Sequence, residues 1–198
     1  MTQSTTPHTT LPVSTQPRPR DVQVADIGPH TQVLRSRTWE RLKFEVEYGL
    51  RRGTTANSYL IQGEKTAVID PPGESFTAMY LGELAHHVKF CDINYIIVSH
   101  VNSNRMATLE QLRELAPQAI MVCSRPAANA LKQALLAWDD VLYPVRSGDD
   151  LDLGLGHRLE FSRVPTPRWP DGLCTYDPAT QILYSDKLFG AHICNDFL

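Results

Sequence analysis

Apolar and polar positions change their spacing along the chain, which separates a strand-rich start from a remainder in which helices and strands alternate. A period of two is typical of half-buried strands, and a period near 3.6 is typical of amphipathic helices. The pattern predicts strands over residues 22–27, 31–34, 43–48, 57–61, 66–70, 93–98, 119–123, 141–145, 158–164, 174–176 and 182–185. It predicts helices over residues 75–88, 107–115 and 126–138. A strand-rich start followed by strand–helix units indicates an α/β fold in which helices cover a sheet.

Three short polar segments predict turns. Residues 63–65 separate two apolar runs and predict a hairpin, and residues 177–180 predict a second one between the last two strands. Gly154-Leu155-Gly156 has neither a following Lys-Ser/Thr nor a helix start, so it predicts a turn and not a phosphate-binding loop.

The first twenty residues differ in composition from the rest. They hold four of the fourteen prolines, many Ser and Thr, and no acidic residue. This composition predicts a disordered lead-in over residues 1–20, followed by one domain over residues 21–198. An organelle transit peptide is the alternative, although the segment has only two arginines and no amphipathic helical period.

Composition excludes several classes of protein. The formal net charge is −3, so no overall positive field would attract nucleic acid or an anionic membrane. No apolar run approaches the roughly 18 residues of a membrane-spanning helix. Four cysteines lie without CxxC spacing, which predicts reduced and mostly buried thiols in an intracellular protein.

The exit of the strand at residues 93–98 is the most informative place for chemistry. His100 follows this strand directly, in a polar segment that runs to Ala107. Strand ends in open α/β sheets are where sites are built, although a lone His there is more often structural than a ligand. Ser99 lacks the flanking glycines of a nucleophile elbow, which argues against a serine hydrolase.

Four landmarks together resemble a known family. They are residues 57–61 leading through a hairpin to residues 69–70, His100 at a strand end, residues 167–171 (PRWPD), and residues 183–192 (LYSDKLFGAH). In order and spacing this set resembles the metallo-β-lactamase-like domain of flavodiiron proteins, of the cyanobacterial and plastid (diflavin) type. The resemblance implies an αββα-type sandwich that is incomplete at its C-terminus. It also implies oxygen reduction to water at a non-haem diiron centre fed by FMN, which that family carries in modules this sequence does not include.

The family's ligand motif is only partly present. That motif has the form H-x-E-x-D-H-x-G, then a His before Trp-Pro-Asp, an Asp before Phe-Gly, and a later His. The resemblance places six positions of this chain on the motif, and only the first keeps a family ligand: His100, Asn102, Asn104, Arg105, Arg168 and Lys187.

These residue types do not suit an iron site. Iron centres use imidazole and anionic oxygen donors, whereas Asn is a poor neutral donor and Arg cannot deprotonate. We therefore expect no bound metal and no cofactor in this chain. Arg105, Arg168 and Lys187 would converge instead, and their charge would be balanced by Asp70, Asp171 or Asp186, or else by a bound anion. A slip of one residue would place Asp186 in the site instead of Lys187.

The resemblance implies a subunit of an NAD(P)H:oxygen oxidoreductase in photosynthetic electron transport. Because its own diiron ligands are replaced, the chain is expected to act in a homo- or hetero-oligomer with a ligand-complete paralogue. NAD(P)H or a redox protein would donate electrons through the absent modules. The expected location is the cyanobacterial cytosol, near thylakoids, rather than a plastid. The alternative is a non-catalytic anion-binding or dimerisation module of the same fold. A zinc hydrolase is disfavoured because its His-x-His-x-Asp-His cluster is missing.

Overall fold

The computed structural model describes residues 20–39, 53–134, 138, 140–190 and 194. Its strands are β1 (Asp21–Gly28), β2 (Thr31–Thr38), β3 (Thr54–Gln62), β4 (Thr66–Ile69), β5 (Ile93–Val98), β6 (Ile120–Ser124), β7 (Leu142–Val145), β8 (Asp150–Gly154), β9 (His157–Arg163), β10 (Leu173–Asp177) and β11 (Ile182–Tyr184). Its helices are α1 (Thr77–His87), α2 (Met106–Leu115) and α3 (Arg125–Ala134), with 3₁₀ turns at Glu74–Phe76, Phe90–Asp92 and Ser103–Arg105.

The strands form two sheets. Over the residues that the structure describes, the larger sheet has seven strands in chain order, β1 to β7, and the smaller sheet has the order β11-β10-β9-β8. Neighbours from β1 to β4 run antiparallel, whereas β4 to β7 run parallel. Each parallel pair needs a crossover connection, and α1, α2 and α3 supply the three crossovers. The carboxyl ends of β4, β5 and β6 therefore lie along the same edge of the sheet.

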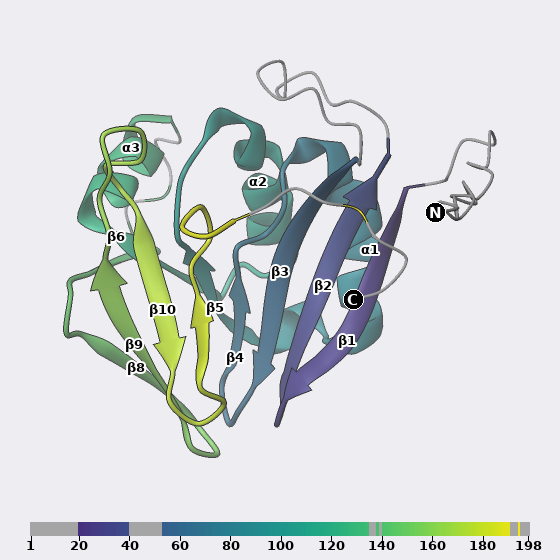
Figure 1. Ribbon diagram of the computed structural model, residues 1–198, viewed down its shortest axis with the longest axis horizontal. Coiled ribbons are helices and arrows are strands. Elements are labelled where there is room, and N and C mark those ends of the chain that lie inside the picture. The colour runs from purple at the N-terminus through teal and green to yellow at the C-terminus, as the bar shows by residue number, and fades with distance from the viewer. Residues whose placement is uncertain (1–19, 40–52, 135–137, 139, 191–193, 195–198) are drawn as a thin grey trace, which may run out of the picture.

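Two apolar layers hold these elements together. Figure 1 shows the three helices behind the large sheet and the small sheet in front of it. Buried Leu84 of α1, Leu109 of α2 and Leu131 of α3 pack with Ile96 on one face of the large sheet. On the other face Ile97 packs with residues of the small sheet, among them Phe161. Because neighbouring strand residues point to opposite faces, Ile96 and Ile97 serve the two layers separately.

The α/β sandwich expected from the sequence is confirmed, and both predicted hairpins form. Thr175 pairs with Tyr184 across the second one. The turn at residues 154–156 is also confirmed, with all three residues at positive φ.

The prediction was wrong or incomplete in four places. It gave no strand at Asp150–Gly154, where β8 pairs with β9. It ended the second strand four residues early and began the strand at 57 three residues late, since β2 runs to Thr38 and β3 starts at Thr54. Trp138, placed in the third helix, lies outside helical structure. The strand expected over 43–48 and the lead-in over 1–19 fall outside the described residues.

Two further expectations concern the membrane and the cysteines. None of the helices in the described ranges combines the length and the apolar character that a membrane crossing requires. All four cysteines are free thiols, and Cys123 and Cys174 are buried as expected. Cys91 is exposed, and Cys194 is half-buried with its thiol against the carbonyl oxygens of Thr38 and Thr54.

Candidate functional site

Arg105 is the centre of a buried ion-pair network at the carboxyl ends of the parallel strands. Its guanidinium donates from one terminal nitrogen to Asp70 Oδ1 at 3.2 Å and to the His100 carbonyl at 3.1 Å. The other terminal nitrogen donates to Asp186 Oδ1 at 2.7 Å. Arg105 is only 8% exposed, so this cation is stabilised by two carboxylates and not by water. The network joins residues that follow β4, β5 and β11.

Both carboxylate partners lie on unusual backbone. Asp70 has φ 52° and Asp186 has φ 44°, in the left-handed region that few residues other than glycine adopt. Aspartate tolerates this region better than most side chains. Asp70 also accepts the Ser99 backbone N–H at 2.9 Å, which fixes its carboxylate against the end of β5. The sharp turns after β4 and β11 thus bring the two carboxylates to the same guanidinium.

Burial and charge shift the acidity of this network. Burial raises the pKa of Asp70 to about 6, and the neighbouring Asp186 carboxylate adds to the rise while Arg105 opposes it. Burial alone would lower the pKa of Arg105, but Asp186 and Asp70 outweigh that effect and raise it further above its usual value. Arg105 therefore keeps its charge at all physiological pH values.

His100 is bound to a third carboxylate. Its Nδ1 lies 2.7 Å from Asp171 Oδ1, and the Val101 N–H donates to Asp171 Oδ2 at 2.8 Å. Burial would raise the pKa of Asp171, but these two hydrogen bonds outweigh it and hold the pKa below the usual range. The ring of Trp169 meets the His100 ring edge to face at 6.3 Å. These contacts orient the His100 ring, which lies outside the Arg105 network although the His100 carbonyl belongs to it.

The two asparagines serve the local backbone. Asn102 Oδ1 accepts the Arg105 N–H at 3.1 Å and so caps the 3₁₀ turn Ser103–Arg105. Asn104 lies against Gly73, and its Oδ1 is buried without a hydrogen-bond partner among the described residues. Neither side chain contributes charge to the site.

The three cations of the sequence analysis are placed differently from one another. Arg105 is buried in its network, whereas Arg168 is exposed, with its guanidinium 5.6 Å from the Trp169 ring centroid. Lys187 is half-buried. Burial lowers the pKa of Lys187, and Arg105 and Arg168 lower it as well, while Asp186 and Asp70 act in the opposite direction. Of these cations, Lys187 lines the adjoining pocket and the two arginines do not.

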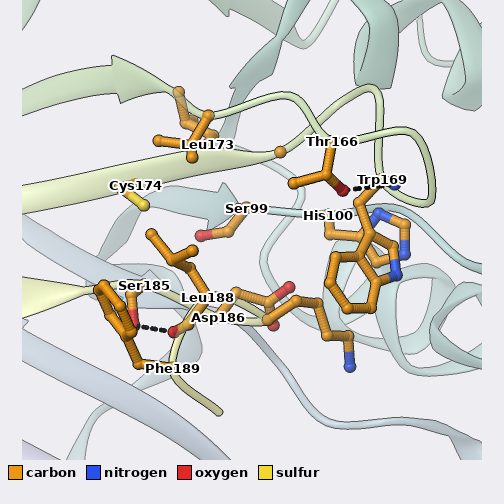
Figure 2. A pocket seen from close by; sticks show the side chains of 13 residues that line it. Ser99, His100, Thr166, Trp169, Leu173, Cys174, Ser185, Asp186, Leu188 and Phe189 are labelled. Atoms are coloured by element: carbon orange, nitrogen blue, oxygen red, sulfur yellow. Dashed lines mark hydrogen bonds between the residues drawn. The ribbon is translucent and has the colours of Figure 1, made fainter.

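That pocket lies beside the network, with about 100 Å³ of accessible volume. Figure 2 shows Ser99, His100, Trp169 and Asp186 around it. The rest of its wall is mostly apolar. It comes from the residue after β9, the start of β10 and the segment after β11: Val164, Leu173, Cys174, Leu188 and Phe189. The sequence placed Leu188 and Phe189 within the landmark at residues 183–192, but it indicated no pocket role for any of these five residues.

The donor set of this site does not match a pair of iron ions. Within the described ranges, no three His, Cys, Asp or Glu side chains come together in a way that could hold a metal ion. The positive guanidinium of Arg105 lies between Asp70 and Asp186, and it uses carboxylate oxygens that a metal would need. His100 and Asp171 are bound to each other. The charge of Arg105 is thus balanced within the chain by the carboxylates of Asp70 and Asp186.

In this chain, helices cover one face of the large sheet and a smaller antiparallel sheet packs on the other, with a polar site at the strand ends. This architecture defines the class of metallo-β-lactamase-like domains. Residues 54–197 match the family model described as ODP family beta lactamase. The chain belongs to this family, as the N-terminal domain type of the cyanobacterial diflavin flavoproteins, which are flavodiiron proteins.

Sequence and structural relatives agree on this assignment. Diflavin flavoprotein A 4 of Nostoc sp. (strain PCC 7120) is 65% identical over 188 residues, 95% of this chain and 33% of that protein. The crystal structure of a fragment (1–254) of diflavin flavoprotein A 5 from Nostoc sp. PCC 7120 superposes with a TM-score of 0.87 at 55% identity. The matched region covers 90% of this chain and 71% of the fragment.

The metal-soaked Flv1 flavodiiron core from Synechocystis sp. PCC 6803 gives a TM-score of 0.85 at 53% identity, over 89% of this chain and 44% of that one. The family resemblance drawn from the sequence is thus confirmed. The chain spans about a third of the length of the curated relatives it matches.

Proposed function

We propose that this chain is a subunit of a flavodiiron-type NAD(P)H:oxygen oxidoreductase whose own diiron ligands are replaced, and that it acts with a ligand-complete paralogue. One observation carries the proposal. Arg105 is held between Asp70 and Asp186 at the place where the resemblance puts metal ligands. A guanidinium cannot bind a metal ion, and here it also takes up the nearby carboxylates. The oxidoreductase class is supported by the diflavin and flavodiiron names of the relatives.

The division of labour follows from the chemistry. Reducing O₂ to two water molecules consumes four electrons and four protons, which two NAD(P)H molecules and two further protons supply. In this proposal the metal centre of the paralogue performs the oxygen step. Flavin modules carry the electrons, and they would lie in the two thirds of the relatives' length that this chain does not span. In this oligomer the domain of this chain is the partner of the paralogue's metal-binding domain.

Two further parts of the proposal concern organisation and location. Residues 21–198 would form the metallo-β-lactamase-like domain, preceded by a lead-in over residues 1–20. The proposed location is the cyanobacterial cytosol, near thylakoids, and the organisms of the relatives support the cyanobacterial part of it.

Co-expression with a ligand-complete paralogue tests the partnership. The complex should be recovered in a pull-down, and its NAD(P)H-dependent oxygen uptake should differ from that of the paralogue alone. A matched control uses the paralogue with one metal ligand replaced, which should still form the complex but consume no oxygen. If no complex forms and the rate is unchanged, the partnership is wrong, and a non-catalytic anion-binding or dimerisation module of the same fold is favoured instead.

A further inference from the structure

The pocket beside the ion-pair network contains two buried polar atoms without partners. Ser99 is fully buried, and its Oγ lies near the Asp70 carboxylate but makes no hydrogen bond of normal geometry with the described residues. Asp186 has a side chain that is 9% exposed, and its Oδ2 is likewise unpartnered there although Oδ1 binds Arg105. Both residues line the same pocket (Figure 2). A buried polar group left without a partner costs free energy, so these atoms indicate a missing hydrogen-bonding group.

The charges around the pocket argue against a bound anion. Three carboxylates, those of Asp70, Asp171 and Asp186, lie in or beside it, against the cations of Arg105 and Lys187. Both terminal nitrogens of Arg105 are already bonded, one to Asp70 and the His100 carbonyl and the other to Asp186. The cationic group that lines the pocket is Lys187, close to the Asp186 carboxylate. An anion would meet these carboxylates, and a cation would meet Lys187.

A neutral hydroxyl group has the chemistry that both free atoms require. It can donate its hydrogen to Asp186 Oδ2, which accepts only, and it can accept the hydrogen of Ser99 Oγ. The remaining wall is apolar, with Val164, Leu173 and Leu188 in it, and would bury a hydrocarbon body. The volume of about 100 Å³ exceeds the roughly 30 Å³ share of one water molecule.

We infer that this pocket binds a small neutral alcohol or phenol, with the hydroxyl between Ser99 and Asp186 and the apolar body against Val164, Leu173 and Leu188. The inference concerns this chain alone and does not depend on the partner subunit proposed above.

Titration of the 198-residue chain with benzyl alcohol tests the inference, observed through the ¹³C-methyl NMR signals of leucine and valine. Saturable shifts are expected at Leu173, Leu188 and Val164. Toluene, which lacks the hydroxyl, and benzoate, which is an anion, should bind more weakly. Ser99→Ala should weaken benzyl alcohol about fivefold, as expected for one lost hydrogen bond, and leave toluene unchanged. This variant keeps the Ser99 backbone bond to Asp70, and its fold is checked by circular dichroism.

A second variant, Val164→Trp, fills the pocket and should abolish the shifts at Leu173 and Leu188. The inference is overturned if benzyl alcohol produces no saturable shift, because the free atoms are then satisfied by water alone. It is equally overturned if toluene binds as well as benzyl alcohol, or if Ser99→Ala leaves the affinity for benzyl alcohol unchanged. Oxygen uptake by the complex with a paralogue is a separate measurement, so the two proposals can fail independently.

Discussion

Arg105 joins three segments that are far apart in the sequence, and the energetics of the site follow from its burial. Removing a buried charge from a network leaves its partners uncompensated, which costs more than the network itself contributes. Asp70 and Asp186 would face each other without the guanidinium, in a region where Asp70 already has a raised pKa. The site is therefore sensitive to the loss of the cation and less sensitive to changes at its exposed rim.

Arg105→Ala is expected to lower the free energy of unfolding by about 3–5 kcal/mol, because two buried carboxylates lose their counter-charge. Urea denaturation followed by circular dichroism measures the change. Arg168→Ala is the matched control, since Arg168 is exposed, and it should cost less than about 1 kcal/mol. Equal effects of the two variants would contradict the network's role.

Asp70→Asn is expected to lower the free energy of unfolding more at pH 4.5 than at pH 7. The reason is that the pKa of Asp70 is raised to about 6 in the folded chain, so its contribution to stability depends on pH. A carboxyl group with a higher pKa in the folded state binds its proton more tightly there. Its contribution to stability is largest below its ordinary pKa near 4 and is lost as pH rises toward 6. The asparagine variant removes this dependence while its amide oxygen can still accept the Ser99 N–H.

Relative to the asparagine variant, the parent chain should thus lose stability between pH 4.5 and pH 7. Urea denaturation of both proteins at the two pH values gives the comparison. A parent chain that gains stability over the variant across this range would show that the Asp70 pKa is lowered and not raised.

At the scale of elements, local pattern predicted the strands and helices whose apolar faces are buried, such as β5 and α2. It failed where pairing with a distant segment decides the structure. β8 has the sequence DLDLG, whose aspartates are poor strand formers, and it is a strand because it pairs with β9. The charged end of β2 continues because Arg37 binds Asp21 on β1 through two 2.6 Å hydrogen bonds.

The same limit applies to the site. The sequence identified Asp70, Asp171 and Asp186 as possible partners for the cations. It did not show which group each aspartate would bind. Among the described contacts, Asp171 binds His100 rather than Arg105 or Lys187. Strand alternation predicted that either Asp186 or Lys187 would face the site. Because Asp186 lies at positive φ, both residues line the pocket.

Leu155→Asn is expected to raise the free energy of unfolding by about 0.5–1 kcal/mol. Leu155 has φ 53° in the turn between β8 and β9, and its side chain is 57% exposed. The left-handed backbone therefore costs conformational free energy that burial of the side chain does not offset. Asparagine adopts this region more readily. Thermal unfolding measures the gain. Leu183→Asn, at a leucine of β11 that is 48% exposed, is the control and should give no gain. A loss of stability at position 155 would contradict the strain argument.

At the scale of the whole molecule, a flavodiiron-type sandwich has kept its architecture while its strand-end site holds an internal salt-bridge network. The helix layer, the two sheets and the hydrogen bond from the Leu173 N–H to the Ser99 carbonyl hold the strand ends in place. Arg105 then supplies, within the chain, a positive charge for carboxylates that converge there. The dependence on a ligand-complete paralogue, proposed above, rests on Arg105 lying where the resemblance puts metal ligands.

The metal content of the purified chain tests this account most directly. The chain is expressed in iron-supplemented medium beside a ligand-complete flavodiiron domain, and both are analysed by inductively coupled plasma mass spectrometry. The account predicts no stoichiometric iron in this chain, and no rise in its unfolding temperature when ferrous iron is added, whereas the control domain retains its iron. Two iron ions per chain, with a rise in unfolding temperature on iron addition, would contradict it.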